Sequence, residues 1–240
     1  MVIAATCFAA VCCKKADNND NPNNNQKDPD KPNEEQPAKY TAPIKIDGDF
    51  SDWAKLDDSK VATARNSDGS SYEALKIVKV YADEMYVYIY FEWDKELIEH
   101  SGDELVPLHI YINGDGDAST GGFADEFEDA CMDFMTEGFL FDGNDKVTSY
   151  DPGCYKWEGE VNGSGWDDCW VDIDSSSDLF VGAGVEGKYE LAMTRELYPL
   201  GKLADNFSIG FDIQQSWDSV GILPNSAEGH AASLQVVTVK

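Results

Sequence analysis

The sequence predicts an all-β protein folded as a single, jelly-roll-like β-sandwich. From residue 40 onward, short runs of β-branched and aromatic residues recur, turns of Gly, Asp and Asn separate them, and helical periodicity is scarce. Many short strands joined by frequent turns are typical of sandwiches and jelly rolls. With 42% hydrophobic and 12% aromatic residues, this 240-residue chain can form a packed core, which excludes a wholly disordered protein.

The clearest strand pair is Leu75–Tyr81 and Met85–Trp93, separated by a short polar turn. In the second run, Met85, Val87, Ile89, Phe91 and Trp93 alternate with three tyrosines, as in a β-strand with two distinct faces. Because both faces are apolar or aromatic, we expect a central strand covered on each side, or one whose tyrosine face meets a ligand.

The remaining strand predictions follow the same reasoning. Only Ser51–Leu56 and Arg195–Leu200 resemble short helical turns. The further predicted strands are Val106–Ile112, Ala130–Met135, Gly138–Phe141, Lys146–Tyr150, Cys154–Glu158, Cys169–Ile173, Leu179–Ala183, Tyr189–Met193, Phe207–Gln214 and Leu234–Val239.

The first residues resemble a bacterial lipoprotein signal. Val2–Val11 is a ten-residue apolar run, the length of a signal-peptide core, and Cys12 and Cys13 follow it as in a lipobox. We expect residues 1–13 to be the signal and Cys13 to carry the lipid, with Cys12 as the alternative site. An ordinary cleaved secretory signal is the second interpretation.

A polar segment separates this signal from the predicted domain. Residues 14–39 are rich in Asn, Asp, Pro, Lys and Glu and hold no aliphatic residue larger than Ala. Such a segment cannot bury enough apolar surface to offset the entropy of ordering it, so we expect a disordered tether. Residues 40–240 then form the sandwich, displayed at a bacterial cell envelope, most simply at the surface of the outer membrane.

The charge excludes several partners. Lys and Arg total 18 against 46 Asp and Glu, a formal net charge of −28. This surface repels nucleic-acid phosphates and anionic lipids but attracts cations. No apolar run is long enough for a membrane-spanning helix. We therefore expect no nucleic-acid partner, a membrane association only through the lipid anchor, and a monomer.

An acidic loop after a predicted strand is a candidate calcium site. Oxygen-bearing side chains alternate there among glycines, as Ca²⁺ coordination favours. The loop is no EF-hand, since Thr120 occupies the usual glycine position and no helices flank it. A solvated acidic turn is the alternative interpretation. The predicted structural Ca²⁺ ligands are Asn113, Asp115, Asp117, Ser119 and Glu126; Asp125, Glu128, Asp129 and Asp133 could complete the shell.

The cysteines predict one disulfide and no catalytic thiol. In an oxidising envelope compartment, Cys154 and Cys169 could close the loop between two strands, whereas Cys131 lies in an apolar run and is expected to be a buried thiol. His100, His109 and His230 fit no zinc spacing.

Several motifs in order resemble carbohydrate-binding module family 9 and its DOMON-like relatives. Ile44–Trp53 is similar to the family's opening "I-DG-L-DW" motif, Leu108–Gly122 to its strand and "D-x-D, T-G" loop, and Tyr189–Arg195 to its late "YE-A-I-R" strand. The resemblance covers residues 40–240. It implies a β-sandwich, structural calcium, and a sugar held between two Trp rings.

Aromatic residues beside polar ones are candidates for such a sugar site. Trp157 and Trp166 fall in a segment rich in Gly and Asp, and Trp217 closely follows Gln214 and Gln215. We expect Trp217 to pair with Trp166 or Trp157, and the two glutamines to bind sugar hydroxyls. Half-buried packing aromatics are the alternative for each.

These features together predict a function in capture. No nucleophile elbow, P-loop or dinucleotide motif occurs, and no carboxylate pair stands out among the acids, so we expect no enzyme. The expected function is non-catalytic binding of polysaccharide or oligosaccharide by an envelope lipoprotein. The alternatives are an adhesive or structural sandwich without a sugar site and, ranked lower, a glycan-degrading enzyme.

Overall fold

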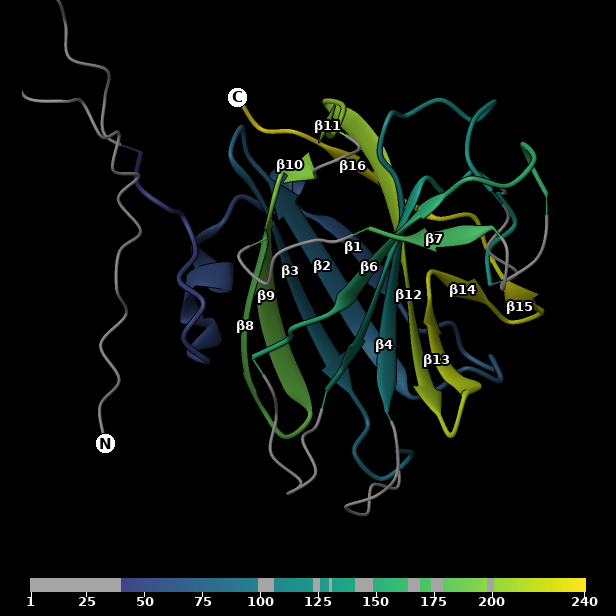
Figure 1. Ribbon diagram of the computed structural model, residues 1–240. Coiled ribbons are helices and arrows are strands. Elements are labelled where there is room, and N and C mark those ends of the chain that lie inside the picture. Colours follow the sequence, from purple (N-terminus) through teal and green to yellow (C-terminus); the bar gives the residue numbers. More distant parts are fainter. Residues whose placement is uncertain are drawn as a thin grey trace, which may run out of the picture. The chain divides into compact units, whose positions relative to one another are not determined.

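Two antiparallel sheets make up the main body of the protein (Figure 1). The computed structural model describes residues 40–98, 106–122, 126–129, 131–140, 149–163, 169–173, 179–197 and 201–240. The first sheet has five strands in the order β1-β2-β3-β9-β8. Its strands are β1 (Ala62–Arg65), β2 (Leu75–Ala82), β3 (Tyr86–Trp93), β8 (Phe180–Val185) and β9 (Lys188–Thr194).

The second sheet has seven strands, with β13-β12-β4-β5-β6-β7 as its main order. One edge of β12 pairs with β4, and its other edge pairs first with β16 and then with β13. The strands are β4 (Pro107–Asn113), β5 (Phe134–Phe139), β6 (Gly153–Trp157), β7 (Trp170–Asp172), β12 (Asn206–Gln215), β13 (Asp218–Leu223) and β16 (Leu234–Val237).

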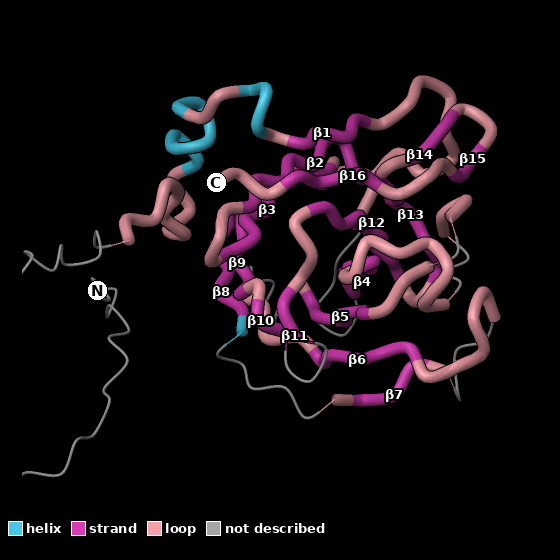
Figure 2. The backbone as a smooth tube through the Cα atoms, turned by 90° about the horizontal axis from the view of Figure 1, so that it is seen from above, coloured by secondary structure: helices cyan, strands magenta, loops and turns pink. Residues whose placement is uncertain are grey.

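The main hydrophobic core lies between the two sheets. It joins residues such as Val80, Ile89 and Leu191 from the first sheet to Ile110 and Phe211 from the second. Figure 2 shows these layers from above, with β8 and β9 on one side and β4, β5 and β12 on the other. The predicted all-β sandwich is therefore confirmed.

Strand β3 has the two-faced character that its alternation predicts. Val87, Ile89 and Phe91 belong to the core between the sheets, while Tyr88 and Tyr90 are buried on the outer face of the first sheet. The strand is central, between β2 and β9. The interpretation as a strand covered on both sides is confirmed, and its tyrosine face packs against protein.

Several predicted boundaries change. Ala130–Met135 and Gly138–Phe141 are predicted as two strands, but a single strand, β5, runs from the end of the first range to the start of the second. Arg195–Leu200 was expected to be helical, but its described part contains β10 (Glu196–Leu197), paired with β11 (Gly201–Lys202). The predicted Ser51–Leu56 turn is the 3-10 helix η1 (Phe50–Lys55). Smaller elements absent from the prediction are η2 (Asp58–Lys60), β1, β13, β14 (Asn225–Ser226) and β15 (Gly229–His230).

A buried carboxylate fixes the N-terminal motif to the first sheet. Glu190 on β9 is fully buried and accepts hydrogen bonds from the backbone N–H groups of Asp47 and Gly48 and from the Trp53 indole, at 2.9–3.1 Å. Gly48 adopts a φ of 78°, a conformation that favours glycine. Burial raises the pKa of Glu190, although these donors favour its charged form. The Asp-Gly and Trp of the motif thus share one acceptor.

The chain divides into two units, Met1–Thr41 and Ala42–Lys240. The predicted signal, tether and Cys13 lie outside the described residues, as does most of the predicted Lys146–Tyr150 strand. Where the chain is described, no helix has the length and apolarity to cross a membrane.

Candidate functional site

A cleft of about 320 Å³ lies beside the acidic loop, at the end of β4 where Asn113 stands. The loop, the end of β6 and β11 all contribute to its walls. Its lining combines one aromatic ring with two carboxylates, a hydroxyl and an ammonium group. The lining residues are Gly114, Asp115, Thr120, Gly121, Asp133, Trp157, Gly201, Lys202 and Leu203.

The ring of Trp157 is fixed at the cleft by contacts on several sides. It is the last residue of β6, and its indole N–H donates to the Glu160 carbonyl at 3.1 Å. The ring lies so close to Gly122 that any side chain there would overlap it. It also packs edge-to-face on Trp170 with ring centroids 5.2 Å apart. The cleft therefore has one pre-positioned aromatic wall.

The polar groups of the cleft are ordered by the loop itself. Asp133 accepts the backbone N–H of Gly114 at 2.7 Å, and burial raises the pKa of its carboxyl. Thr120 donates its hydroxyl to Asp115 at 2.9 Å. Lys202, on β11, adds a positive charge to the lining. The cleft thus offers both hydrogen-bond donors and acceptors.

The predicted calcium ligands are largely engaged within the loop. Asn113 points its amide at the Cys131 sulfur, 3.0 Å away, and its carbonyl oxygen accepts from Gly116. Asp115 and Asp117 each accept the N–H two residues ahead. Those hydrogen bonds define Asx turns, which explain the alternating acids without a metal.

The remaining ligand predictions give no converging set. Ser119 donates its hydroxyl proton to Asp117. Glu126 lies near the Tyr111 phenol; burial is the main cause that raises the pKa of Tyr111, and the Glu126 charge raises it further. Among the residues that the structure describes, no group of three or more His, Cys, Asp or Glu side chains is arranged to hold a metal ion. Bound calcium stays a prediction, and no step of the function depends on it.

The predicted sugar-binding residues do not come together. Trp217 is 52% exposed at the tip of the β12–β13 hairpin, where both Ser216 and Trp217 have positive φ. Gln214 is buried and donates to Asp212 at 2.6 Å, and Gln215 is partly buried on the same strand. Trp166 lies outside the described residues.

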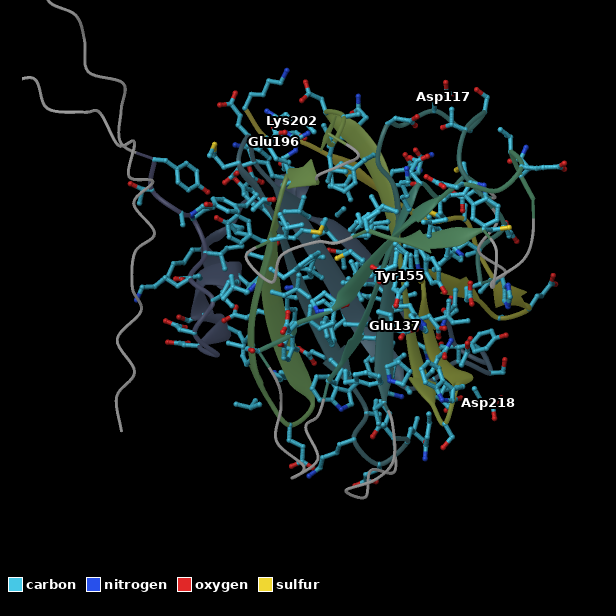
Figure 3. All side chains as sticks on the ribbon, in the orientation of Figure 1. Asp117, Glu137, Tyr155, Glu196, Lys202 and Asp218 are labelled. Carbon is cyan, nitrogen blue, oxygen red and sulfur yellow. The ribbon has the colours of Figure 1, made fainter. Side chains whose placement is uncertain are left out.

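Trp157 and Trp217 lie at opposite ends of the second sheet. The backbone N–H of Trp157 donates to the Asp133 carbonyl, beside the Ile112 end of β4, whereas the hairpin with Trp217 extends past the pairing of Ile213 with Leu108. The seven residues of β4 span about 20 Å. In Figure 3, Asp117 of the loop is labelled near the top of the sheets and Asp218 of the hairpin near their lower edge. One sugar ring cannot lie between these two indoles.

The predicted disulfide is not formed, because Cys154 and Cys169 are both free thiols. The backbone carbonyl of Cys154 accepts the N–H of Ile173, and that of Cys169 accepts the N–H of Glu158, so the cysteines lie at opposite ends of the β6–β7 ladder. Four residues of strand correspond to about 13 Å, well above the roughly 7 Å limit between Cα atoms in a disulfide. The expectation of a buried Cys131 is confirmed.

The sequence reasoning missed a charged row on the second sheet. His109 was treated as an isolated histidine, but it lies directly between Asp212 and Glu137 of the neighbouring strands. Only the strand order β12-β4-β5 brings these residues together, and no local signal in the sequence reveals that order.

The comparisons with known proteins leave the family open. No model of a known protein family matches this chain, and no curated protein is significantly similar to it. The resemblance to carbohydrate-binding module family 9 therefore stays a prediction, supported by its motifs and compatible with an all-β fold.

Proposed function

We propose that this protein is a non-catalytic carbohydrate-binding domain that captures polysaccharide or oligosaccharide in the Trp157 cleft. The observation that carries the proposal is a fixed indole at the wall of a cleft that also holds carboxylates, a hydroxyl and an ammonium group. Sugars present apolar C–H faces and hydroxyls, so their binding sites combine aromatic rings with a few polar groups.

Each side chain has a defined role in this proposal. The Trp157 ring would stack against a sugar face, and its contacts with Gly122 and Trp170 reduce the entropy lost on binding. Asp115 and Asp133 would accept hydrogen bonds from sugar hydroxyls, while Lys202 would donate to a ring or hydroxyl oxygen.

The proposal includes the lipid-anchored envelope location, with Cys13 as the anchor.

The test is a glycan array, followed by titration calorimetry on the strongest hit. Trp157→Ala should weaken binding at least tenfold, about 1.4 kcal/mol, because it removes the stacking surface. Trp217→Ala is the matched control, since it removes an exposed indole about 20 Å away and should leave affinity within twofold. No binding across plant, fungal and host glycans would contradict the proposal. If Trp217→Ala abolishes binding and Trp157→Ala does not, the glycan binds at the β12–β13 hairpin and not in the Trp157 cleft.

One observation favours the adhesive alternative. β8 is an edge strand without a charged residue, and Val181 and Val185 on it are each about half exposed. Such edges can pair with another chain. If adhesion is the function, the protein should self-associate with rising concentration in analytical ultracentrifugation, and Val181→Lys should abolish that association without affecting glycan binding.

A further inference from the structure

Three charged side chains form a row across the outer face of the second sheet. His109 on β4 pairs in register with Asp212 on β12 and with Glu137 on β5. Its Nε2 lies 2.9 Å from a Glu137 oxygen, and its Nδ1 lies 3.8 Å from an Asp212 oxygen. The His109 and Asp212 side chains are almost completely buried, whereas that of Glu137 is 20% exposed. The row therefore reaches solvent at Glu137.

The row fixes the position of the Glu137 carboxylate through its contact with the His109 ring. Buried ion pairs seldom stabilise a protein more than apolar residues of similar volume, because their desolvation offsets their attraction. Burial opposes the charging of His109, but its two carboxylate partners raise its pKa to about 9. One positive and two negative groups leave a formal charge of −1 on the row. Its accessible end is the Glu137 carboxylate, which the buried His109 ring contacts.

Tyr155 on β6 completes a surface at that end. It pairs with Met135 of β5 and Asp172 of β7, and the neighbouring Gly153 pairs with Glu137. A β-carbon on Gly153 would lie 2.9 Å from the Tyr155 hydroxyl oxygen, so the tyrosine ring covers the glycine directly across from Glu137. Burial, Glu137 and Asp172 together raise the pKa of Tyr155. Figure 3 shows Tyr155 and Glu137 as neighbours on this face.

This surface continues the cleft along one strand. Tyr155 and Trp157 are two residues apart on β6, so their side chains leave the same face of the strand from Cα atoms about 7 Å apart. Neither lysine nor arginine occurs on β4, β5, β7, β12 or β13, all of which the structure describes. Lys156 is on the opposite face from Tyr155 and pairs with Glu158. The face next to Tyr155 is therefore negative as well as aromatic.

We propose that Tyr155 and Glu137 bind the ammonium group of an amino sugar, as the charged end of the Trp157 site. A cation over an aromatic ring and beside a fixed carboxylate gains both a cation–π contact and a charge-assisted hydrogen bond. Asp172 on the other side of the ring adds to the negative potential. This inference rests on the proposed glycan-binding function and specifies its ligand class as glycans with free amino groups.

The experiment compares two ligands that differ in charge at each sugar: a hexamer of glucosamine and the same hexamer fully N-acetylated. Calorimetry on the purified protein, at a mildly acidic pH where the amines are charged, should give about tenfold tighter binding of the glucosamine hexamer. Glu137→Gln should reduce this preference to near parity, and Tyr155→Ala should reduce it as well, while Tyr155→Phe should keep it because the ring remains.

Controls separate this site from the overall negative charge and from the Trp157 stacking site. Glu84→Gln removes an exposed carboxylate from the β2–β3 turn of the other sheet and should keep the full preference. Trp157→Ala should weaken both ligands but keep their ratio. Equal binding of both hexamers by the wild-type protein, or a preference that survives Glu137→Gln, overturns the inference. Binding of neither hexamer, together with a neutral glycan hit that Trp157→Ala abolishes, also overturns it while leaving the proposed function standing.

Discussion

The outer faces of the two sheets each hold a buried acidic residue, but the two acids have different surroundings. On the first sheet, Glu190 lies beneath the chain's own N-terminal motif, and its partners are two backbone N–H groups and the Trp53 indole. On the second sheet, Asp212 and Glu137 flank a histidine, and this row ends at a partly exposed carboxylate. The comparison teaches that Glu190, enclosed by donors of the chain's own motif, serves the fold, whereas the row on the second sheet ends at a carboxylate that solvent reaches.

The largest effect should come from breaking the first arrangement. Glu190→Ala leaves three donors without their shared acceptor and opens space beneath Trp53, so we expect the free energy of unfolding to fall by about 4 kcal/mol. Urea unfolding followed by tryptophan fluorescence measures this. Glu73→Gln, at an exposed position, is the matched control and should stay within about 0.5 kcal/mol of the wild type. A similarly small change in Glu190→Ala would refute the structural role of this carboxylate.

The second arrangement predicts a pH dependence of stability. The folded-state pKa of His109 is about 9, raised from an unfolded value of 6.5. The charged imidazole therefore contributes its full stabilisation below about pH 6.5, and this contribution is lost as the pH rises through about 9, amounting to at most about 3 kcal/mol. Unfolding free energies measured from neutral to alkaline pH should show this decline.

NMR titration of the imidazole tests the same prediction directly. The His109 ring signals should change with a midpoint well above neutrality, because both carboxylates favour its charged form. A midpoint near 6.5 would contradict the charged row. It would also weaken the argument that His109 positions Glu137.

The smallest expected effect concerns calcium. If the acidic loop binds Ca²⁺ with an affinity typical of extracellular sites, a tenfold excess over Kd stabilises the folded state by about 1.4 kcal/mol and raises Tm by a few degrees. The double variant Asp115→Ala/Asp117→Ala should show no such rise. Identical melting of the wild-type protein with Ca²⁺ and with EDTA would remove calcium from the description.

The sequence predicts local structure well here because each strand carries its own pattern. The alternation in β3 identifies both faces, and the short turn after Ala82 identifies its hairpin with β2. The predictions that failed are those that depend on the order and register of the strands. Cys154 and Cys169 are close along the chain, but they pair with Ile173 and Glu158 at opposite ends of a ladder. Trp217 was predicted as a partner for Trp157, but the two residues lie at opposite ends of the second sheet.

The candidate site was only partly predictable for the same reason. Trp157 and Asp115 were both singled out, for a sugar and for a metal, and the structure places them in one cleft. The Asp212–His109–Glu137 row comes from three strands whose order the sequence does not show. Tyr155 had no signal of its own, because its position near Glu137 depends on the pairing of Gly153 with Glu137 and on the ring lying over that glycine.

The position of β6 in its sheet has a consequence for dynamics. This strand carries both Tyr155 and Trp157, yet its outer neighbour β7 has only three residues. Backbone amides near a weakly supported sheet edge open more often than those at the centre, so β6 amides should exchange with deuterium faster than those of β4 or β12. A ligand bound along β6 should reduce the local opening of this strand. Slower deuterium exchange confined to the β6 amides would then measure how much of the protein has ligand bound.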